Sequence, residues 1–128
     1  MNSLYAFILI VAWHWIADFI FQDEKWALGK SKALKPLLKH TIVYSLLWYL
    51  PIFLVTSDVM SSLYFMLITF VAHTVTDYFT SKAVSKKFAK NELGSSIPNI
   101  GAFTYIGFDQ VLHYVQLVLT WELLIGFI

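Results

Sequence analysis

Four apolar stretches, each long enough to cross a bilayer, constrain the fold of this chain more than any other feature. A spanning helix needs about 20 predominantly apolar residues. Of the 128 residues, 59% are hydrophobic and only 13% are charged, whereas a soluble domain carries about 25% charged residues. The sequence therefore predicts an all-α integral membrane protein, a single four-helix transmembrane bundle over residues 1–128. The expected spans are residues 3–22, 36–56, 60–82 and 104–128.

The segments between these stretches predict how the helices begin and end. Residues 23–35 form a basic connection with room for a short interfacial helix, and residues 83–103 end in an irregular Gly, Pro, Ser and Asn-rich segment. Pro36 suits the first turn of the second helix, and Pro51 is expected to kink that helix or end it early. The first stretch lacks a basic leader and carries ionisable residues, so we expect it to be retained rather than cleaved.

All nine basic residues are lysines, and they flank only two of the three connections. By the positive-inside rule these connections face the cytoplasm, which places both termini outside the inner (cytoplasmic) membrane. Membrane lipid is the expected partner, a homo-oligomer is left open, and a net charge of +1 argues against nucleic acid. The lysines are Lys25, Lys30, Lys32, Lys35, Lys39, Lys82, Lys86, Lys87 and Lys90.

Each predicted helix carries one histidine, and three of them lie four residues from an aspartate. Residues four apart share a helix face. All four histidines fall roughly 6–14 Å from the helix ends that meet the lysine-rich connections, at about 1.5 Å per residue. The polar side chains should therefore converge on one level of the bundle. This set comprises His14, Asp18, His40, His73, Asp77, Asp109 and His113.

Ionisable groups are costly inside a membrane and usually mark a function. Histidine and aspartate without cysteine suit a divalent transition metal, Zn, Mn or Fe, and the seven residues are the candidate ligands. Gln22 and Gln110 could orient such ligands. Two other interpretations remain: a proton or metal-ion pathway, and a polar network that only fixes helix register in a non-catalytic membrane subunit.

The two halves of the chain also resemble each other. His14-x-x-x-Asp18-Phe19 parallels His73-x-x-x-Asp77-Tyr78, and the histidine of each even-numbered predicted helix precedes a tryptophan by eight residues. Chance similarity between aromatic-rich apolar segments is the alternative. If the likeness reflects duplication, the fold consists of two helical hairpins that face each other.

These motifs, His14-x-x-x-Asp18-Phe19-x-x-Gln22, a lysine-flanked His40, His73-x-x-x-Asp77 and Asp109-Gln110-x-x-His113, resemble a family of small bacterial and phage membrane proteins known as domain of unknown function 3307. The resemblance covers nearly the whole chain and implies no established activity. The His-x-x-x-Asp pairs are also distantly similar to membrane-bound metal-dependent hydrolases, which is an analogy of motif only.

The sequence leads to the hypothesis of a membrane-embedded, metal-dependent hydrolase with its site near the cytoplasmic leaflet. A lipid or a phosphorylated molecule is the candidate substrate, and Asp18, Asp77 and Asp109 are the candidate catalytic groups. A conduit would need polar residues across the whole membrane. The outer helix halves, such as residues 6–12 and 117–120, nearly lack ionisable groups, which favours a one-sided site.

The orientation can be tested by single-cysteine labelling, because the chain has no cysteine of its own. A membrane-impermeant maleimide added to intact cells should modify a Ser57→Cys variant, which lies in the turn expected outside. It should modify Lys86→Cys only after the cells are broken. The reverse pattern would show that the topology is inverted.

Overall fold

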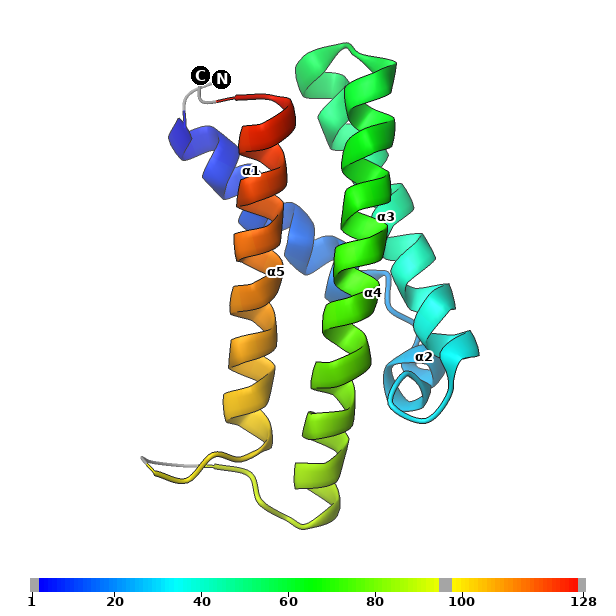
Figure 1. The fold of residues 1–128 in the computed structure, drawn as a ribbon, viewed down its shortest axis with the longest axis vertical. Helices are drawn as coiled ribbons and strands as arrows, with labels where there is room; N and C mark the ends of the chain where they lie inside the picture. Colours follow the sequence, from blue (N-terminus) through cyan, green and yellow to red (C-terminus); the bar gives the residue numbers. More distant parts are fainter. Residues whose placement is uncertain (1–2, 95–97, 127–128) are drawn as a thin grey trace.

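The computed structural model describes residues 3–94 and 98–126, and all the regular secondary structure in these residues is helical. The first helix continues into a π-helical turn. A short helix follows, and three long helices complete the fold (Figure 1). The middle of the 83–103 connection and the predicted end of the last helix at residue 128 lie outside the described residues. The elements are α1 (Ser3–Trp15), η1 (Ile16–Ile20), α2 (Glu24–Gly29), α3 (Leu34–Thr56), α4 (Val59–Ala89) and α5 (Ala102–Leu124).

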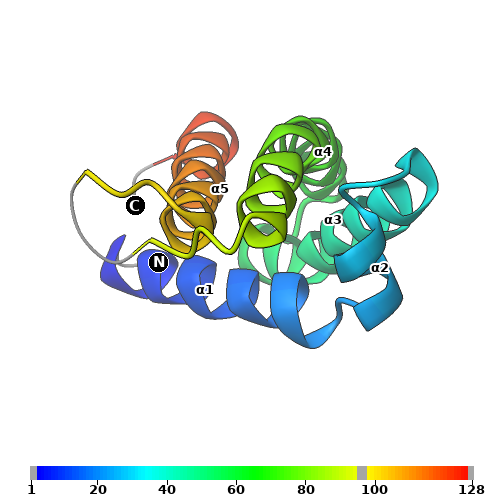
Figure 2. The same cartoon turned by 90° about the horizontal axis from the view of Figure 1, so that it is seen from below.

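Helices α3, α4 and α5 form a layer with α4 in the middle, and α1 crosses one face of that layer obliquely (Figure 2). The α3–α4 connection is a tight turn at Ser57, which adopts a left-handed conformation, and at Asp58, whose carboxylate accepts from the first amides of α4. This turn lies at the same end of the molecule as the two termini (Figure 1).

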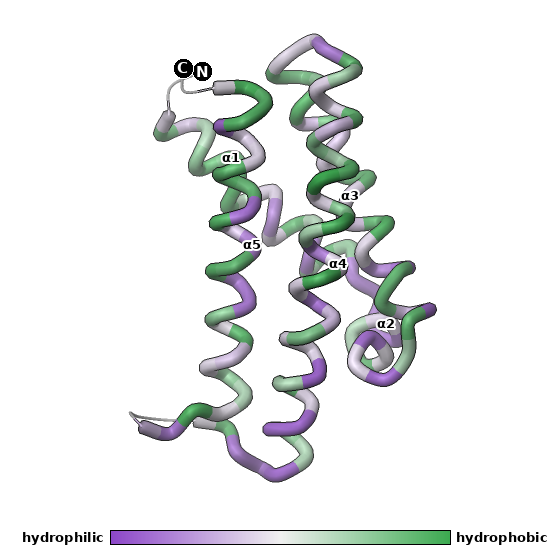
Figure 3. The backbone as a smooth tube through the Cα atoms, viewed as in Figure 1, coloured by the Kyte–Doolittle hydropathy of each residue, from purple (hydrophilic) through white to green (hydrophobic). Residues whose placement is uncertain are grey.

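Three helical segments of the described chain are long and apolar enough to cross a membrane: residues 3–20, α3 and α4. The short helix predicted between the first two stretches is confirmed as α2. Helix α5 is not among the three, because polar residues such as Asp109, Gln110 and Gln116 interrupt its apolar run. Hydrophilic and hydrophobic stretches alternate along α5 in Figure 3. The chain is thus an all-α protein of membrane type, and the four-span bundle stays a prediction.

The duplicated hairpins also stay a prediction, because the two halves pack differently. Helices α4 and α5 lie side by side, whereas α1 packs mainly against α5 and reaches α3 only near its end, through Trp13, His14 and the π-helical extension η1. Helix α4 runs to Ala89, well beyond the predicted end at residue 82. At about 1.5 Å per residue this helix of 31 residues is longer than the hydrocarbon thickness of a bilayer, about 30 Å.

Pro51 does not end α3, which continues to Thr56, so the expected early end is wrong. A proline within a helix leaves the carbonyl four residues earlier without its usual amide donor. Here that carbonyl belongs to Leu47, and the indole Nε1 of Trp13 donates to it at 3.0 Å. The neighbouring helix α1 thus supplies the hydrogen bond that the proline removes, which makes the proline tolerable in an apolar environment.

The distribution of side chains is that of a membrane protein, with much of its polar surface inside. The buried face of α4 carries Phe65 among hydroxyl, imidazole and carboxylate groups, while Leu67, Val71 and Val75 are more than half exposed. Away from the polar cluster, Trp48, Phe65 and Trp121 belong to a compact apolar core. Apolar side chains facing outward around buried polar ones are stable when lipid is the solvent.

The segment between α4 and α5 closes on itself at two glycines. The amides of Ala102 and Phe103 donate to the carbonyls of Glu92 and Leu93 at 2.8 and 3.0 Å. A Cβ on Gly101 would lie 2.1 Å from the backbone nitrogen of Gly94. This close approach fixes where α5 begins, and therefore its register against α4.

Gly101→Ala should accordingly destabilise the fold by about 1–3 kcal/mol or more, since the overlap is with backbone that cannot move aside cheaply. Gly107→Ala is the matched control: its Cβ would meet nothing within 4 Å, and alanine in an exposed helix should add about 0.5–1 kcal/mol. Unfolding of both variants in detergent measures the difference, and equal stability of the two would contradict the close contact.

Candidate functional site

All seven polar residues singled out in the sequence gather in one cluster inside the molecule. Each is at most 9% exposed. They come from every long element: two from α1 and η1, one from α3, two from α4 and two from α5. Convergence at one level is therefore observed. The assignment of all seven as metal ligands, and of three as catalytic groups, stays a prediction.

The π-helical turn η1 carries Asp18 into this cluster. The amide of Phe21 donates to the carbonyl of Ile16, five residues earlier, at 3.1 Å, which is the spacing of a π-helix. Such turns are rare and are frequent at functional sites, because the wider turn re-aims side chains. Asp18 is buried as a result, while Phe19 and Ile20 point outward. Nothing in the hydrophobic pattern indicated this turn.

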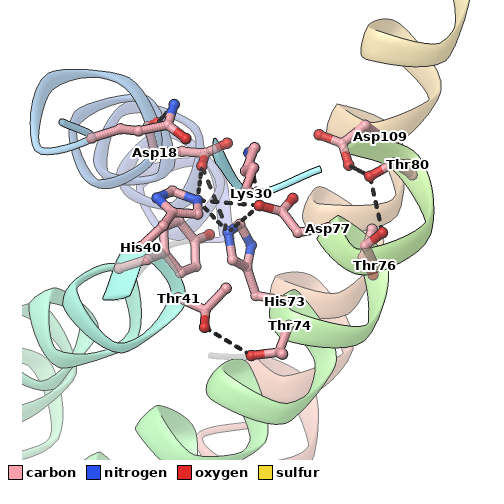
Figure 4. A network of polar contacts seen from close by, with 12 residues as sticks. Asp18, Lys30, His40, Thr41, His73, Thr74, Thr76, Asp77, Thr80 and Asp109 are labelled. Carbon is pink, nitrogen blue, oxygen red and sulfur yellow. Dashed lines mark hydrogen bonds and ion pairs between the residues drawn. The ribbon is translucent and has the colours of Figure 1, made fainter. Parts of the chain in front are cut away.

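Three donor atoms meet at the centre of the cluster: Asp18 Oδ1, His40 Nε2 and His73 Nε2 (Figure 4). The Nε2 atoms of His40 and His73 are 3.0 Å apart. Asp18 Oδ1 lies 3.0 Å from His40 Nε2 and 3.6 Å from His73 Nε2. Donors bound to one tetrahedral ion at 2.0–2.1 Å are about 3.3 Å apart, so these separations suit three ligands of one metal ion.

The oxygen Asp18 Oδ1 is buried and accepts no hydrogen bond of suitable geometry in the described structure, although two imidazole nitrogens lie near it. A buried carboxylate oxygen without a donor costs free energy. A cation between this oxygen and the two imidazoles would satisfy all three electron pairs at once. The donor set therefore fits a metal ion better than it fits hydrogen bonding alone.

Asp77 lies beside these donors and is paired with a lysine from outside the spans. Its Oδ2 is 2.7 Å from Lys30 Nζ and 3.3 Å from His40 Nε2. Burial opposes the charged form of Lys30, but the carboxylates of Asp77 and Asp18 outweigh it and raise the pKa of Lys30. Lys30 is consequently a fixed positive charge at the cluster, a role in addition to the topology that its place in a lysine-rich connection predicts.

A second row of contacts runs from His73 to α5. His73 Nδ1 is 3.1 Å from His113 Nδ1, and His113 Nε2 is 3.3 Å from carboxylate oxygens of both Asp77 and Asp109. If His73 Nε2 offers its lone pair to a metal, its Nδ1–H donates to His113. His113 then carries its proton on Nε2 and donates to a carboxylate. Such chains orient metal-bound imidazoles and raise their basicity.

Asp109 is held in place by neutral donors. The hydroxyl of Thr80 donates to its Oδ1 at 2.5 Å, and the amide of Gln110 donates to its Oδ2 at 3.0 Å. Gln110 also lies 3.5 Å from Asp18 Oδ2. The orienting role expected for Gln110 agrees with these contacts, whereas nothing in the sequence pattern pointed to Thr80.

His14 has protein partners on both ring nitrogens: the Tyr44 hydroxyl at 2.7 Å from Nδ1 and Gln110 Oε1 at 2.8 Å from Nε2. Its Nε2 is 3.7 Å from Asp18 Oδ2. Tyr44 in turn stacks on His73, with ring centroids 3.8 Å apart and planes 9° from parallel. His14 and Tyr44 thus support Asp18 and His73 from the apolar side of the cluster.

A pocket of about 500 Å³ leads to the cluster on the side of the lysine-rich connections. Its polar end includes the three aspartates, Lys30 and Gln110. Apolar side chains from η1, α2, α4 and α5 form much of the remaining lining; they include Phe19, Leu28, Val84, Phe88 and Ile106. A small molecule could therefore reach the carboxylates of the cluster through this opening.

Residues 6–127 match the family model described as Protein of unknown function (DUF3307). The chain belongs to this family. The match runs from within α1 through α5 and includes all seven residues of the cluster. No curated protein and no solved structure matches the chain. The likeness to membrane-bound metal-dependent hydrolases accordingly rests on the motifs alone.

Replacing Tyr44 by phenylalanine tests how the cluster of this DUF3307 protein is held together. The variant keeps the ring that stacks on His73 but leaves His14 Nδ1 without its buried partner. We expect a loss of about 1–3 kcal/mol in the free energy of unfolding. Tyr64→Phe, at a residue 51% exposed on α4, should change stability little. Equal effects of the two substitutions would contradict the described role of Tyr44.

Proposed function

We propose that this protein is a membrane-embedded, metal-dependent hydrolase whose site opens toward the cytoplasm. The observation that carries the proposal is the meeting of Asp18 Oδ1, His40 Nε2 and His73 Nε2 within 3.0–3.6 Å, with no hydrogen bond of suitable geometry to Asp18 Oδ1. Three protein ligands and an open position are typical of catalytic metal sites, whereas structural sites are closed.

Charge balance supports a divalent cation. Three aspartates and one lysine leave two formal negative charges in the cluster when the four imidazoles are neutral. Uncompensated buried charge is strongly destabilising. One divalent ion neutralises the set, and it does so without requiring any histidine to carry a proton. Zn, Mn and Fe(II) all accept imidazole and carboxylate ligands.

The ion would lower the pKa of a bound water and polarise the bond to be cleaved. Asp77 lies against the same imidazoles and lines the pocket, so it is placed to take the proton of the attacking water. His113 and Asp109 orient His73 from behind. Tyr44 and the apolar core close the opposite side and keep water out. Hydrolysis thus needs only water and a substrate that enters through the pocket.

The membrane placement forms part of the proposal. Helix α5 crosses as a fourth span alongside α3 and α4, and the lysine-rich ends of α2 and α4 lie in the cytoplasm. Lysine placement supports this orientation. Helix α1 crosses the layer of α3, α4 and α5 (Figure 2), and its last turn together with η1 brings His14 and Asp18 to the cluster. In this arrangement the pocket opens near the headgroups of the inner leaflet.

A proton or metal-ion conduit is the second candidate, because polar contacts continue beyond the cluster. The amide of Gln116 donates to the hydroxyls of Thr69 and Thr120 at 3.3 and 2.9 Å. Residues 59–72 of α4, however, contain no aspartate, glutamate, histidine or lysine. The row therefore lacks the ionisable groups that proton relays use. Metal uptake into proteoliposomes distinguishes the two candidates, since the hydrolase should show none.

The metal itself is tested by binding and stability. Purified protein should bind about one Zn, Mn or Fe(II) per chain. His73→Ala and Asp18→Asn should each weaken binding by more than about 100-fold, beyond the effect of losing an orienting partner. At a metal concentration 100 times the Kd, the metal adds about 2.7 kcal/mol to the stability of the wild type. The two variants should lose this increment.

Thr69→Ala is the control for general damage, because Thr69 is buried on the same face of α4, one turn from His73, and outside the donor set. It should keep the metal and the metal-dependent stabilisation. A wild-type protein that stays metal-free and unchanged in thermal stability with each of the three ions would refute the metal site, and the hydrolase with it.

A further inference from the structure

The geometry points to a phosphate-bearing amphiphile as the ligand of the pocket, with Lys30 as the residue that recognises the phosphate. This inference rests on the proposed function and names the substrate class of the same site. It begins from Lys30, a residue of the connection between η1 and α3 that reaches into the cluster. Its side chain is only 17% exposed.

Lys30 is placed by local structure rather than by chance. The amide of Lys30 donates to the carbonyl of Trp26 at 2.8 Å, which ends α2. Gly29 lies against Pro36 so closely that an added Cβ would be 2.9 Å from the proline ring. This packing of the end of α2 on the start of α3 holds the lysine over Asp77. A lysine recruited only to set topology would need no such support.

The polar end of the pocket combines attraction for an anion with a place for its hydrolysis. Lys30 Nζ, Asp77 and Asp18 line the pocket together, and the two aspartates belong to the proposed metal site and its base. A phosphate bound to the metal would lie beside the ammonium of Lys30. Lys30 can then exchange its contact with Asp77 for one with the phosphate, which frees Asp77 to accept a proton.

The charge of the cluster favours this exchange. With a divalent ion in place the cluster is formally neutral only because Lys30 offsets one aspartate. An incoming phosphate needs positive charge, and ammonium groups bind phosphate as strong, charge-assisted donors. The chain has no arginine, so lysine has to supply this charge. Lys30 is the lysine that contacts the described cluster, while Lys32 lines the pocket without an ion pair to it.

The rest of the pocket suits an apolar chain. Leu28 on α2 and Phe19 on η1 line it and are 66% and 48% exposed, and Phe88 at the end of α4 is 46% exposed. These side chains reach from the pocket wall to the outer surface. In the proposed orientation Phe19 faces lipid, while Leu28 and Phe88, beside the lysine-rich ends of α2 and α4, lie at the level of the headgroups. An acyl chain could follow them out of the pocket while the headgroup stays with Lys30. A free phosphate ester would leave this wall unused.

The test measures binding by protein loaded with Zn in nanodiscs. Phosphatidic acid in the disc should raise the unfolding temperature, and inorganic phosphate should do so far more weakly. Lys30→Gln should weaken the response to phosphatidic acid by about tenfold or more, the value of one charge-assisted hydrogen bond. Lys30→Arg should restore most of it. Lys25→Gln, at an exposed lysine of the same connection that is not among the pocket-lining residues, is the matched control and should behave like the wild type.

Two further measurements separate the parts of the inference. Lys30→Gln should bind as much zinc per chain as the wild type. If neither protein binds zinc, the proposed function is refuted, and the recognition of an amphiphile is not what failed. Leu28→Ser should weaken the response to phosphatidic acid but not to inorganic phosphate. Equal responses to both ligands would overturn the amphiphile in favour of free phosphate. A Lys30→Gln variant with intact zinc and unchanged phosphatidic acid binding would overturn recognition by Lys30.

Discussion

The structure depends on one constraint: three carboxylates and four imidazoles are buried inside the bundle, largely out of reach of solvent. Each must therefore find its partner inside the protein. The described contacts show how this is done. Asp109 takes donors from Thr80 and Gln110, Asp77 takes Lys30, and His14 takes Tyr44 and Gln110. Asp18 Oδ1 is the exception. In a cluster otherwise so fully paired, the unpaired oxygen between two imidazoles is the natural position of a cation.

The same constraint explains the irregular features of the helices. Pro51 is compatible with an apolar environment because Trp13 supplies the hydrogen bond to Leu47. The π-turn is compatible with it because the Phe21 amide still finds a carbonyl, at Ile16. Both irregularities lie where α1 and η1 cross the layer of α3, α4 and α5. Helix α1 and its extension η1 therefore contribute polar groups at two places along the layer: the indole of Trp13 and the carboxylate of Asp18.

Much of this could be predicted from the sequence, and the remainder has identifiable physical reasons. Apolar length located the helices, and the four-residue spacing of His73 and Asp77 placed the polar groups on one face, because both signals are local. The crossing of α1 and the π-turn at Asp18 depend on tertiary packing, which no periodic pattern of apolar residues in the sequence indicates. The contact of Lys30 with the cluster was not predicted, because the positive-inside rule accounts for all lysines of a connection alike and does not distinguish a buried one. The short sequence distance between Lys30 and Pro36, with a glycine beside the lysine, is the signal that could have drawn attention to it.

The origin of the three proposed ligands bears on how a metal would act on the fold. Asp18 comes from η1, His40 from α3 and His73 from α4. Helices α3 and α4 are already joined by a tight turn and by the hydroxyl contact between Thr74 and Thr41 at 2.9 Å. Helix α1 is attached more sparsely, through Trp13, His14 and a few apolar side chains. A metal held by all three elements would therefore stabilise mainly the docking of α1 and η1. Since Phe19 on η1 also lines the pocket, binding of the ion and formation of the pocket wall are expected to be coupled.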